Sequence, residues 1–391
     1  MNILHFMSVL TELGGDFYTG VPDSLLAPFC DHIMETHGIS DKHIVAANEG
    51  AAVGLAAGRY LATGKPSVVY MQNSGLGNAV NPICSLLKLY DIPVIFVIGW
   101  RGEPGIPDEP QHTFQGEITL PLLDCLEIPY KVISKEDGIN INDTNINGIN
   151  INDTNIDGIK TFKKLLMQGK SVAFVIKKSA LKNEKKMTYA SNAAMSREDI
   201  LKIILQSANP QDVFVCTTGK LSREVFEIRA SQVSDSDAHH SRDFLTVGSM
   251  GHSLMIAHGI ALAQPDRTVF CLDGDGAAIM HLGSLAVVGV HSPKNLVHVV
   301  VNNGAHETVG GMPVVSAKLD MSQVAQTLGY RHTFRVSTKE DIQQVLAQLT
   351  SLEGPVFIEA ISNLLSRKDL GRPTTTPLEN KAAFMDFLSK Q

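Results

Sequence analysis

The sequence predicts an α/β protein made of two doubly wound parallel-sheet domains, and three observations lead to this prediction. Short β-branched apolar runs alternate with helix-length segments along nearly the whole chain of 391 residues. Most of these runs are apolar at every position, which is typical of strands buried on both faces of a sheet. A polar, lysine-rich stretch near the middle separates two halves of similar size. Strand–helix–strand repetition of this kind favours parallel sheets.

The elements can be placed from these runs. The expected strands are Ile44–Ala47, Ser67–Met71, Val94–Ile98, Ser171–Ile176, Val213–Cys216, Thr268–Leu272, Leu296–Val301 and Val356–Ile361. The expected helices are Gly50–Leu61, Leu76–Leu89, Ser249–Ala263 and Ile279–Val290. Each expected helix lies between two expected strands, as the crossover of a βαβ unit does.

Two polar interruptions define the domain organisation. In the first, at 138–157, GININDTNIN is followed by GININDTNID. Two copies are too few for a solenoid, so we interpret them as a surface insertion without a catalytic role, or alternatively as an extra edge hairpin. The second, Lys177–Ser196, lacks apolar periodicity and is typical of a linker. The expected domains are residues 1–180 and 196–391, joined by a linker at 181–195.

Composition and charge exclude several classes of protein. Apolar residues make up 44% of the chain and charged residues 19%, which is an ordinary globular composition. The formal net charge of −7 argues against binding to nucleic acid or to an anionic membrane. No apolar run is long enough to span a bilayer, and the N-terminus lacks the pattern of a signal peptide.

The cysteines indicate a reducing environment. Their number is odd and no two of them form a C-x-x-C pair, so neither a disulfide framework nor a thiolate zinc site is predicted. A cytoplasmic protein with reduced thiols is therefore expected. The five cysteines are Cys30, Cys84, Cys125, Cys216 and Cys271.

One segment of the second half carries a pattern that points to chemistry. An expected strand runs into Gly274-Asp275-Gly276, and a second one runs into Asn302-Asn303 after the 25 residues 277–301. This interval fits one helix and one return strand of a βαβ unit. Because the crossover brings the carboxyl ends of parallel strands to the same edge of a sheet, Asp275 and Asn303 are expected side by side where such sheets bind ligands.

Both side chains offer hard oxygen ligands. Magnesium prefers a few such ligands and completes its octahedron with water and phosphate oxygens. The flanking glycines let the backbone approach closely and direct amides at phosphate oxygens. Either dipeptide alone would be interpreted as a turn that caps a strand. Together, at this spacing, they predict a magnesium–diphosphate site.

This spacing resembles the cofactor motif of the thiamine-diphosphate-dependent enzymes. The resemblance implies that magnesium is held by Asp275, by Asn303 and by the backbone carbonyl of Ala305, with Asn302 as the alternative to Asn303. It also implies the thiamine-diphosphate-binding fold for both domains, pyrimidine-binding in the first and diphosphate-binding in the second.

The first half resembles the pyrimidine-binding domain of the same family. Glu49 follows an expected strand and opens a helix rich in Gly and Ala. In isolation, an acidic residue there would be explained by the helix dipole. The resemblance implies that Glu49 hydrogen-bonds a ring nitrogen of the aminopyrimidine and moves a proton there, so Glu49 is a candidate catalytic and cofactor-binding residue.

Further loops match the family's cofactor contacts. Val247–Gly251 resembles the loop whose bulky residue, here Met250, supports the bent cofactor; a helix-start Met is the alternative. Loops after two other expected strands, Thr217–Lys220 and Gln72–Gly75, would face the diphosphate, the substrate or the cofactor. Besides Glu49, the candidate cofactor residues are Gln72, Asn73, Thr218, Gly219, Gly248, Ser249, Met250, Gly274, Asp275, Gly276, Ala277 and Asn303.

The order of pyrimidine half, short linker and diphosphate half resembles a branch of 2-oxoacid decarboxylases without a middle domain. Segments Thr19–Leu25, Pro107–Gly116, Thr217–Glu224 and Asn302–Pro313 carry this closer resemblance. It implies a 2-oxoacid substrate with a second anionic group, a phosphonate or a sulfonate. It also implies a homodimer or a dimer of dimers, in which Glu49 of one subunit faces Asp275 of another.

A doubly anionic substrate requires local cations in an acidic chain. Arginine suits bidentate binding of a phosphonate, whereas lysine acts as a point charge. His112 is also a candidate catalytic residue, because a histidine there could shuttle a proton, although the family's adjacent histidine pair is reduced to one. Asp23 and Ser24 could contact substrate or cap a helix. The candidate substrate residues are Asp23, Ser24, Arg101, His112, Lys220, Arg223 and His306.

Two alternatives to decarboxylation stay open at this point. One is another thiamine-dependent reaction, such as carboligation with an acceptor aldehyde. The other is a phosphate- or nucleotide-binding module without catalysis. A Rossmann dehydrogenase is disfavoured, because the sequence after Gly274 lacks the third glycine of G-x-G-x-x-G, and no Walker A motif is present.

Overall fold

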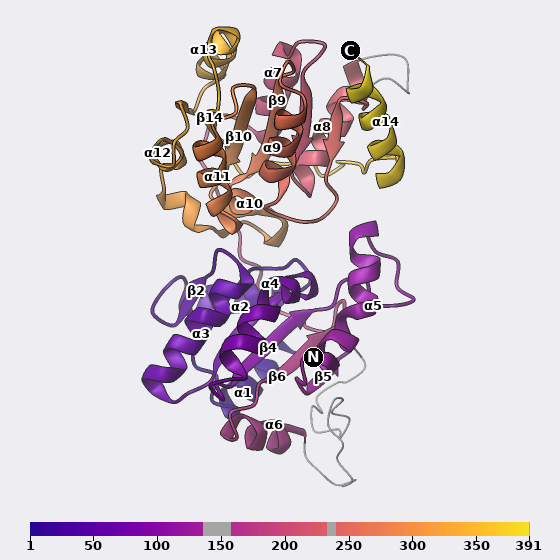
Figure 1. Ribbon diagram of the computed structural model, residues 1–391. Helices are drawn as coiled ribbons and strands as arrows, with labels where there is room; N and C mark the ends of the chain where they lie inside the picture. Colours follow the sequence, from indigo (N-terminus) through magenta and orange to yellow (C-terminus); the bar gives the residue numbers. More distant parts are fainter. Residues whose placement is uncertain (136–157, 233–239, 391) are drawn as a thin grey trace. The chain divides into compact units, whose positions relative to one another are not determined.

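A computed structural model describes residues 1–135, 158–232 and 240–390, which form two compact units (Figure 1). Unit 1 comprises Met1–Thr188 and His306–Met312, and unit 2 comprises Tyr189–Ala305 and Pro313–Gln391. The tandem repeat at 138–157 lies outside the described residues. The first part of the polar stretch interpreted as a linker belongs to unit 1, and its last residue, Ser196, caps the first helix of unit 2.

Unit 1 contains a six-stranded sheet whose strands are all parallel, in the order β2-β1-β3-β4-β6-β5. The strands are β1 (Tyr18–Gly20), β2 (His43–Val45), β3 (Ser67–Gln72), β4 (Val94–Gly99), β5 (Tyr130–Ile133) and β6 (Val172–Ile176). The helices are α1 (Ile3–Glu12), α2 (Ala27–His37), α3 (Glu49–Thr63), α4 (Leu76–Pro82), α5 (Pro110–Cys125) and α6 (Gly158–Met167), with the 3-10 helix η1 (Asn73–Gly75) and the π-helix η2 (Ile83–Leu87).

Alternating residues of the unit 1 strands fill two apolar layers. Helices α1, α2 and α6 pack on one face of the sheet, against side chains such as Val68, Ile95 and Phe174. Helices α3, α4 and α5 cover the other face, against side chains such as Val69 and Phe96. Burial on both faces explains why these strands are apolar at nearly every position.

Unit 2 repeats this architecture with strand order β13-β14-β10-β9-β7-β8, again all parallel. Its strands are β7 (Val213–Cys216), β8 (Asp243–Leu245), β9 (Val269–Gly274), β10 (Leu296–Asn302), β13 (His332–Val336) and β14 (Val356–Ile361), and short strands β11 (Ala305–His306) and β12 (Met312–Pro313) pair with each other. The helices are α7 (Arg197–Ser207), α8 (Lys220–Gln232), α9 (Ser253–Ala263), α10 (Asp275–Met280), α11 (Gly283–His291), α12 (Met321–Thr327), α13 (Lys339–Gln348) and α14 (Pro377–Ser389), with the 3-10 helices η3 (Glu307–Val309), η4 (Val315–Lys318) and η5 (Leu349–Ser351).

The expected fold of two doubly wound parallel sheets is confirmed, and the expected strands agree with the structure to within a few residues. Three expected helices need correction. The one at Leu76–Leu89 is an α-helix only to Pro82 and continues as the π-helix η2 to Leu87. The one at Ser249–Ala263 begins at Ser253, because Ser249 (φ +53°) and Gly251 (φ +87°) have left-handed backbone. The one at Ile279–Val290 is two helices, α10 and α11, interrupted at 281–282.

The strand order places a switch point in each sheet, and ligands of open α/β sheets bind outside the carboxyl ends of the strands at such points. In unit 1 the order reverses between β1 and β3, and in unit 2 between β7 and β9. The candidate residues Asp23, Gln72, Thr218 and Asp275 follow or end these four strands. In the part of the chain that the structure describes, every helix is too short or too polar to span a bilayer.

A buried histidine makes the stability of unit 1 depend on pH. His43 is completely buried; its Nδ1 donates to the Gly38 carbonyl (2.6 Å), and its Nε2 accepts from the Tyr70 hydroxyl (2.8 Å). Burial lowers the pKa of His43 from 6.5 to about 4. The unfolded chain therefore binds the proton more readily, and the stabilising contribution of neutral His43 is complete above pH 6.5 and is lost as the pH falls towards 4.

Replacing His43 with glutamine should reduce this dependence. Between pH 7 and pH 4, wild-type protein should lose up to about 3 kcal/mol more unfolding free energy than the variant. Urea unfolding of both proteins at the two pH values measures the difference. An equal loss in both proteins would show that His43 does not titrate in this way.

Candidate active site

Asp275 is held in one orientation at the carboxyl end of β9. It is the first residue of α10, is 4% exposed, and follows Gly274, whose backbone is extended. Its Oδ2 accepts hydrogen bonds from the Ser316 hydroxyl (2.5 Å) and from the Gly304 N–H (3.0 Å). The carboxylate is therefore fixed by the turn after β10 and by η4.

The electrostatics of Asp275 suit a cation ligand. Burial raises the pKa of Asp275 to about 6, although hydrogen bonds from Ser316 and from the backbone of Gly276 and Gly304 oppose this shift. None of the described lysine or arginine residues forms an ion pair with it. A buried carboxylate that lacks a cationic partner is stabilised by a bound divalent cation, so this residue fits a magnesium site.

The two neighbouring asparagines differ in their contacts. Asn302 is 5% exposed, its amide nitrogen donates to Glu359 Oε1 (2.7 Å), and its Oδ1 accepts from the Gly304 N–H (2.9 Å). Asn303 is only half-buried, and its Oδ1 accepts from the Ala305 N–H (3.0 Å). Each side-chain oxygen thus accepts one backbone N–H, and the contacts differ in that the Asn302 NH2 group also bonds Glu359 on β14.

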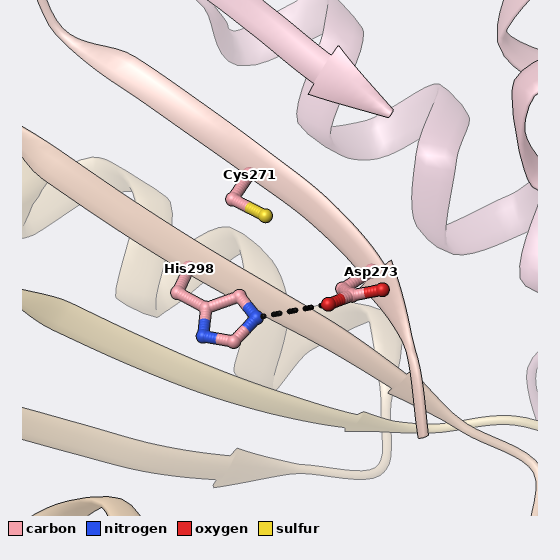
Figure 2. A group of neighbouring side chains, drawn as sticks. All are labelled: Cys271, Asp273 and His298. Atoms are coloured by element: carbon pink, nitrogen blue, oxygen red, sulfur yellow. Dashed lines mark ion pairs between the residues drawn. The ribbon is translucent and has the colours of Figure 1, made fainter. Parts of the chain in front are cut away.

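A second group of metal-type donors lies in the interior of the same unit. Figure 2 shows Cys271 and Asp273 of β9 beside His298 of β10, with His298 Nε2 at 3.6 Å from Asp273 Oδ2. All three are at most 1% exposed, and His298 Nδ1 lies 3.2 Å from the Tyr330 hydroxyl. Burial raises the pKa of the Cys271 thiol, which favours its protonated form in this apolar interior. We interpret these three residues as part of the protein interior that supports the end of β9.

The two glycine-containing loops of unit 2 contact each other. The Thr218 hydroxyl donates to the Val247 carbonyl (2.7 Å), which joins the loop after β7 to the loop that carries Gly248, Ser249 and Met250. Gly219 has a φ of +90°. Met250 is half-buried and lies before the start of α9, so it is not a helix residue.

The two candidate cations of α8 contact the segment after β14. Lys220 donates to the Ser366 hydroxyl (2.8 Å). Arg223 donates to the carbonyl oxygens of Gly371 (2.6 Å) and Leu370. Arg223 thus holds main chain in place, which reduces what it can offer to a substrate anion.

Glu49 is positioned at the start of α3 in unit 1. It follows the N-cap residue Asn48, is 5% exposed, and accepts a hydrogen bond at Oε2 from the Asn78 amide (2.8 Å). Gly75 packs so closely that a Cβ there would lie 2.4 Å from Glu49 Oε1. The absence of a side chain at Gly75 therefore makes room for this carboxylate.

Asp23 and Arg101 lie at the same edge of the sheet. Asp23 is 3% exposed and accepts from the Gln72 amide (2.7 Å) and the Leu25 N–H (2.9 Å), and burial raises its pKa. Arg101 donates to Asp108 through Nε (2.8 Å) and Nη2 (2.5 Å), and more weakly to the Ser24 hydroxyl (3.3 Å). The pKa of Asp108 is held well below its usual range by this pairing, so both partners stay charged.

The remaining candidates have distinct environments. Asn73 is buried, and its side chain bonds the backbone of Arg101 and the Thr119 hydroxyl, so it joins β3 to the loop after β4 and to α5. His112 on α5 is 8% exposed, and burial followed by the charge of Arg101 lowers its pKa to about 4. Its Nδ1 has no hydrogen-bond partner among the described residues. His306 begins the segment 306–312 that belongs to unit 1.

Sequence reasoning missed four residues that orient these groups. They bond the side chains of Glu49, Asp275, Asn302 and Arg101, and no local motif marks any of them. The four are Asn78, Ser316, Glu359 and Asp108. The Gly and Ala residues around Glu49 indicated only that its surroundings are closely packed, because close packing needs small neighbours.

Two family models match the chain. The model described as "Thiamine pyrophosphate enzyme, N-terminal TPP binding domain" matches residues 5–123, and the one described as "Thiamine pyrophosphate enzyme, C-terminal TPP binding domain" matches residues 227–360.

The five cysteines are free in the structure, with Cys84 and Cys125 exposed.

Several curated proteins are similar over nearly the whole chain. A phosphonopyruvate decarboxylase of Streptomyces viridochromogenes is 34% identical over 97% of this chain and 93% of its own length. A phosphonopyruvate decarboxylase of Streptomyces hygroscopicus is 33% identical over 97% of this chain and 92% of its own length. A sulfopyruvate decarboxylase of Methanosarcina acetivorans is 24% identical and covers 88% of each chain.

Proposed function

Because the chain belongs to the thiamine-diphosphate-dependent decarboxylases and, within them, to the family of the phosphonopyruvate decarboxylases, we propose that it converts 3-phosphonopyruvate to phosphonoacetaldehyde and CO2 with the help of magnesium. The observation that supports this choice of substrate is the similarity to two phosphonopyruvate decarboxylases over nearly the full length of each protein. The reaction is non-oxidative, and its place is the biosynthesis of phosphonates of the 2-aminoethylphosphonate type.

Magnesium would be held by Asp275, Asn303 and the carbonyl oxygen of Ala305. The buried Asp275 carboxylate supports this, since two hydrogen bonds fix its Oδ2 and no described lysine or arginine neutralises it. Asn303 would supply its side-chain oxygen, which also accepts the Ala305 N–H, whereas the Asn302 side chain is tied to β14 through Glu359. The loops at Thr218–Gly219 and Gly248–Met250 would bind the diphosphate and the body of the cofactor.

When bound, thiamine diphosphate supplies a carbon nucleophile and accepts the electron pair that the departing CO2 leaves behind. Glu49 would hold and move the proton at the aminopyrimidine ring, and Asn78 fixes the direction of its carboxylate. His112 is neutral near pH 7 because its pKa is lowered, so it would accept or relay a proton rather than act as a fixed cation.

The substrate's two anionic groups would be bound by cations and hydrogen-bond donors at the strand ends. Arg101 is the candidate in unit 1, oriented by its two bonds to Asp108 and close to Ser24 and Asp23. Lys220 is a further cationic candidate, and His306 would be a neutral hydrogen-bond donor, because burial lowers its pKa to about 4. Arg223 is the weaker candidate, since it bonds main-chain carbonyls. We also propose a cytoplasmic homodimer or dimer of dimers, in which Glu49 of one subunit serves the site of Asp275 in another.

Sulfopyruvate is the second candidate substrate. The Methanosarcina sulfopyruvate decarboxylase matches both halves of this chain in a single protein, so the fusion of the two halves does not separate the two activities. We expect kcat/KM to be at least about tenfold higher for 3-phosphonopyruvate than for sulfopyruvate. CO2 release from each substrate, measured on the same preparation, decides the point, and a clear preference for sulfopyruvate would show that our substrate is wrong.

Product analysis tests whether the chain instead catalyses a different thiamine-dependent reaction, carboligation. If an added aldehyde is incorporated into a larger hydroxyketone faster than phosphonoacetaldehyde is released, the chain is a carboligase. Release of phosphonoacetaldehyde as the main product, with or without the aldehyde, supports the decarboxylase.

A further inference from the structure

A buried carboxylate on β14 contacts the turn that carries the proposed metal ligands. Glu359 is completely buried, and its Oε1 accepts a hydrogen bond from the Asn302 amide (2.7 Å). Its Oε2 lies 3.3 Å from the backbone nitrogen of Ser322 and 3.5 Å from Nε of Arg335. Both carboxylate oxygens therefore face hydrogen-bond donors.

This contact decides which way round the Asn302 amide lies. Because the NH2 group donates to Glu359, the amide oxygen is turned to the Gly304 N–H, at 2.9 Å. The same N–H lies 3.0 Å from Oδ2 of Asp275. One backbone hydrogen is thus shared between the end of β10 and the carboxylate at the end of β9.

The turn that follows has little freedom to relax. Gly304 has a φ of +68°, and a Cβ at this position would lie 3.0 Å from the Cβ of Ala317. Asn303 and Ala305 flank this glycine. The directions of the Asn303 side-chain oxygen and of the Ala305 carbonyl oxygen therefore depend on the backbone conformation that the hydrogen bonds of the Gly304 N–H fix.

We propose that Glu359 is a positioning residue for the divalent-cation site, which acts by orienting the Asn302 amide and thereby the turn at residues 302–305. The inference rests on the proposed function, because it takes Asp275, Asn303 and Ala305 as the metal ligands. Groups that orient metal ligands typically change metal affinity by about 10- to 100-fold when they are replaced.

The carboxylate of Glu359 can accept hydrogen bonds from Asn302 and from Ser322 at the same time, whereas a neutral amide of the same shape cannot. A glutamine at this position offers one acceptor and one NH2 group. If its oxygen faces Asn302, its NH2 group faces the Ser322 N–H. If its oxygen faces Ser322, the Asn302 amide must turn over, and its NH2 group then opposes the Gly304 N–H.

The test exchanges the amide and the carboxylate. Glu359→Gln and Asn302→Asp each leave two like groups facing each other, and each should weaken Mg²⁺ binding by about 10- to 100-fold. The double variant Asn302→Asp/Glu359→Gln restores an NH2 group opposite a carboxylate and should return to within about threefold of wild type. Calorimetric titration of the full-length protein with Mg²⁺ at saturating thiamine diphosphate measures the affinities, and the rise in melting temperature on adding Mg²⁺ checks them.

Comparing Mg²⁺ affinity with kcat distinguishes a positioning role from general damage to the fold. At saturating Mg²⁺, kcat of both single variants should stay within about threefold of wild type, because the ligands themselves are intact. The control Glu353→Gln removes a carboxylate just before β14 whose side chain is 62% exposed, and it should bind Mg²⁺ like wild type. Melting temperatures without ligand show whether each variant is folded.

The outcomes separate this inference from the proposed function. A folded double variant that binds Mg²⁺ no better than the single variants overturns the role of Glu359, and this comparison holds even if a single variant does not fold. Single variants that bind like wild type overturn it too. If Asp275→Asn binds Mg²⁺ as tightly as wild type, the ligand set of the proposed function is wrong, whatever the result at Glu359.

Discussion

Glu49→Gln should lower kcat by about 10³-fold, within the range typical of a lost general acid–base group. The substitution keeps the shape of the side chain and one acceptor for Asn78, but it removes the acidic proton that would be moved at the aminopyrimidine ring. Binding of thiamine diphosphate and Mg²⁺ should change little, because Glu49 lies in unit 1, apart in sequence from the proposed diphosphate and metal residues of unit 2. Single-turnover decarboxylation and calorimetric cofactor binding measure the two quantities.

The control for this variant is Glu12→Gln, which neutralises an exposed glutamate of α1 in the same unit. It should leave kcat, KM and cofactor binding unchanged. A Glu49→Gln protein that turns over at the wild-type rate would contradict the assignment of Glu49 and favour a binding module or a different catalytic group.

Asp275→Asn should nearly abolish activity at millimolar Mg²⁺, because it removes the charged ligand of the proposed metal site. We expect Mg²⁺ affinity to fall by at least about 100-fold, more than for a residue that only orients a ligand. Activity measured over a wide range of Mg²⁺ concentrations, together with direct binding, gives the size of the loss. Asp266→Asn, at an exposed position of the same unit, is the matched control.

The same substitution should make the cofactor-free protein more stable. Burial raises the pKa of Asp275 to about 6, so between its unfolded value of 3.8 and 6 the folded state holds the proton more tightly. The carboxylate therefore disfavours folding as the pH rises through this window, by up to about 3 kcal/mol at pH 7. A neutral amide side chain at this position avoids this cost, so the variant should melt at a higher temperature without ligands and should gain much less from Mg²⁺ than wild type does.

A lower melting temperature of the Asp275→Asn protein without ligands would contradict this expectation. It would mean that the charged carboxylate stabilises the fold through its hydrogen bonds with Ser316 and Gly304, and that its main role is structural.

Much of the fold was predictable from local patterns. Strands buried on both faces are apolar at every position, and helices fall between them, so the alternation predicts two parallel sheets without any knowledge of pairing. Where the prediction of helices was wrong, the cause was backbone conformation. Ser249 adopts a left-handed φ that its residue type does not announce, and the interruption at 281–282 lies inside an uninterrupted apolar pattern.

The candidate site was predictable where its residues lie at strand ends. Asp275 and Asn303 follow consecutive strands of one βαβ unit, so their spacing in sequence is enough to bring them to one edge of the sheet. The contacts that orient them were not predictable in this way. Ser316 is 41 residues from Asp275, and Glu359 is 57 residues from Asn302, and no periodicity links such positions.

The sequence by itself determined the family, the cofactor and the two strand ends that would hold it, because spacing along a βαβ unit and glycine or alanine next to a functional group are local properties. Only the tertiary structure decided which side chains remain available there. It paired Asn302 with a carboxylate on β14, engaged Arg223 with main-chain carbonyls and directed Arg101 to Asp108. The physical reason is that a polar group withdrawn from water must find a hydrogen-bond partner, and the fold can supply it from a segment far away in sequence, as β14 does for Asn302.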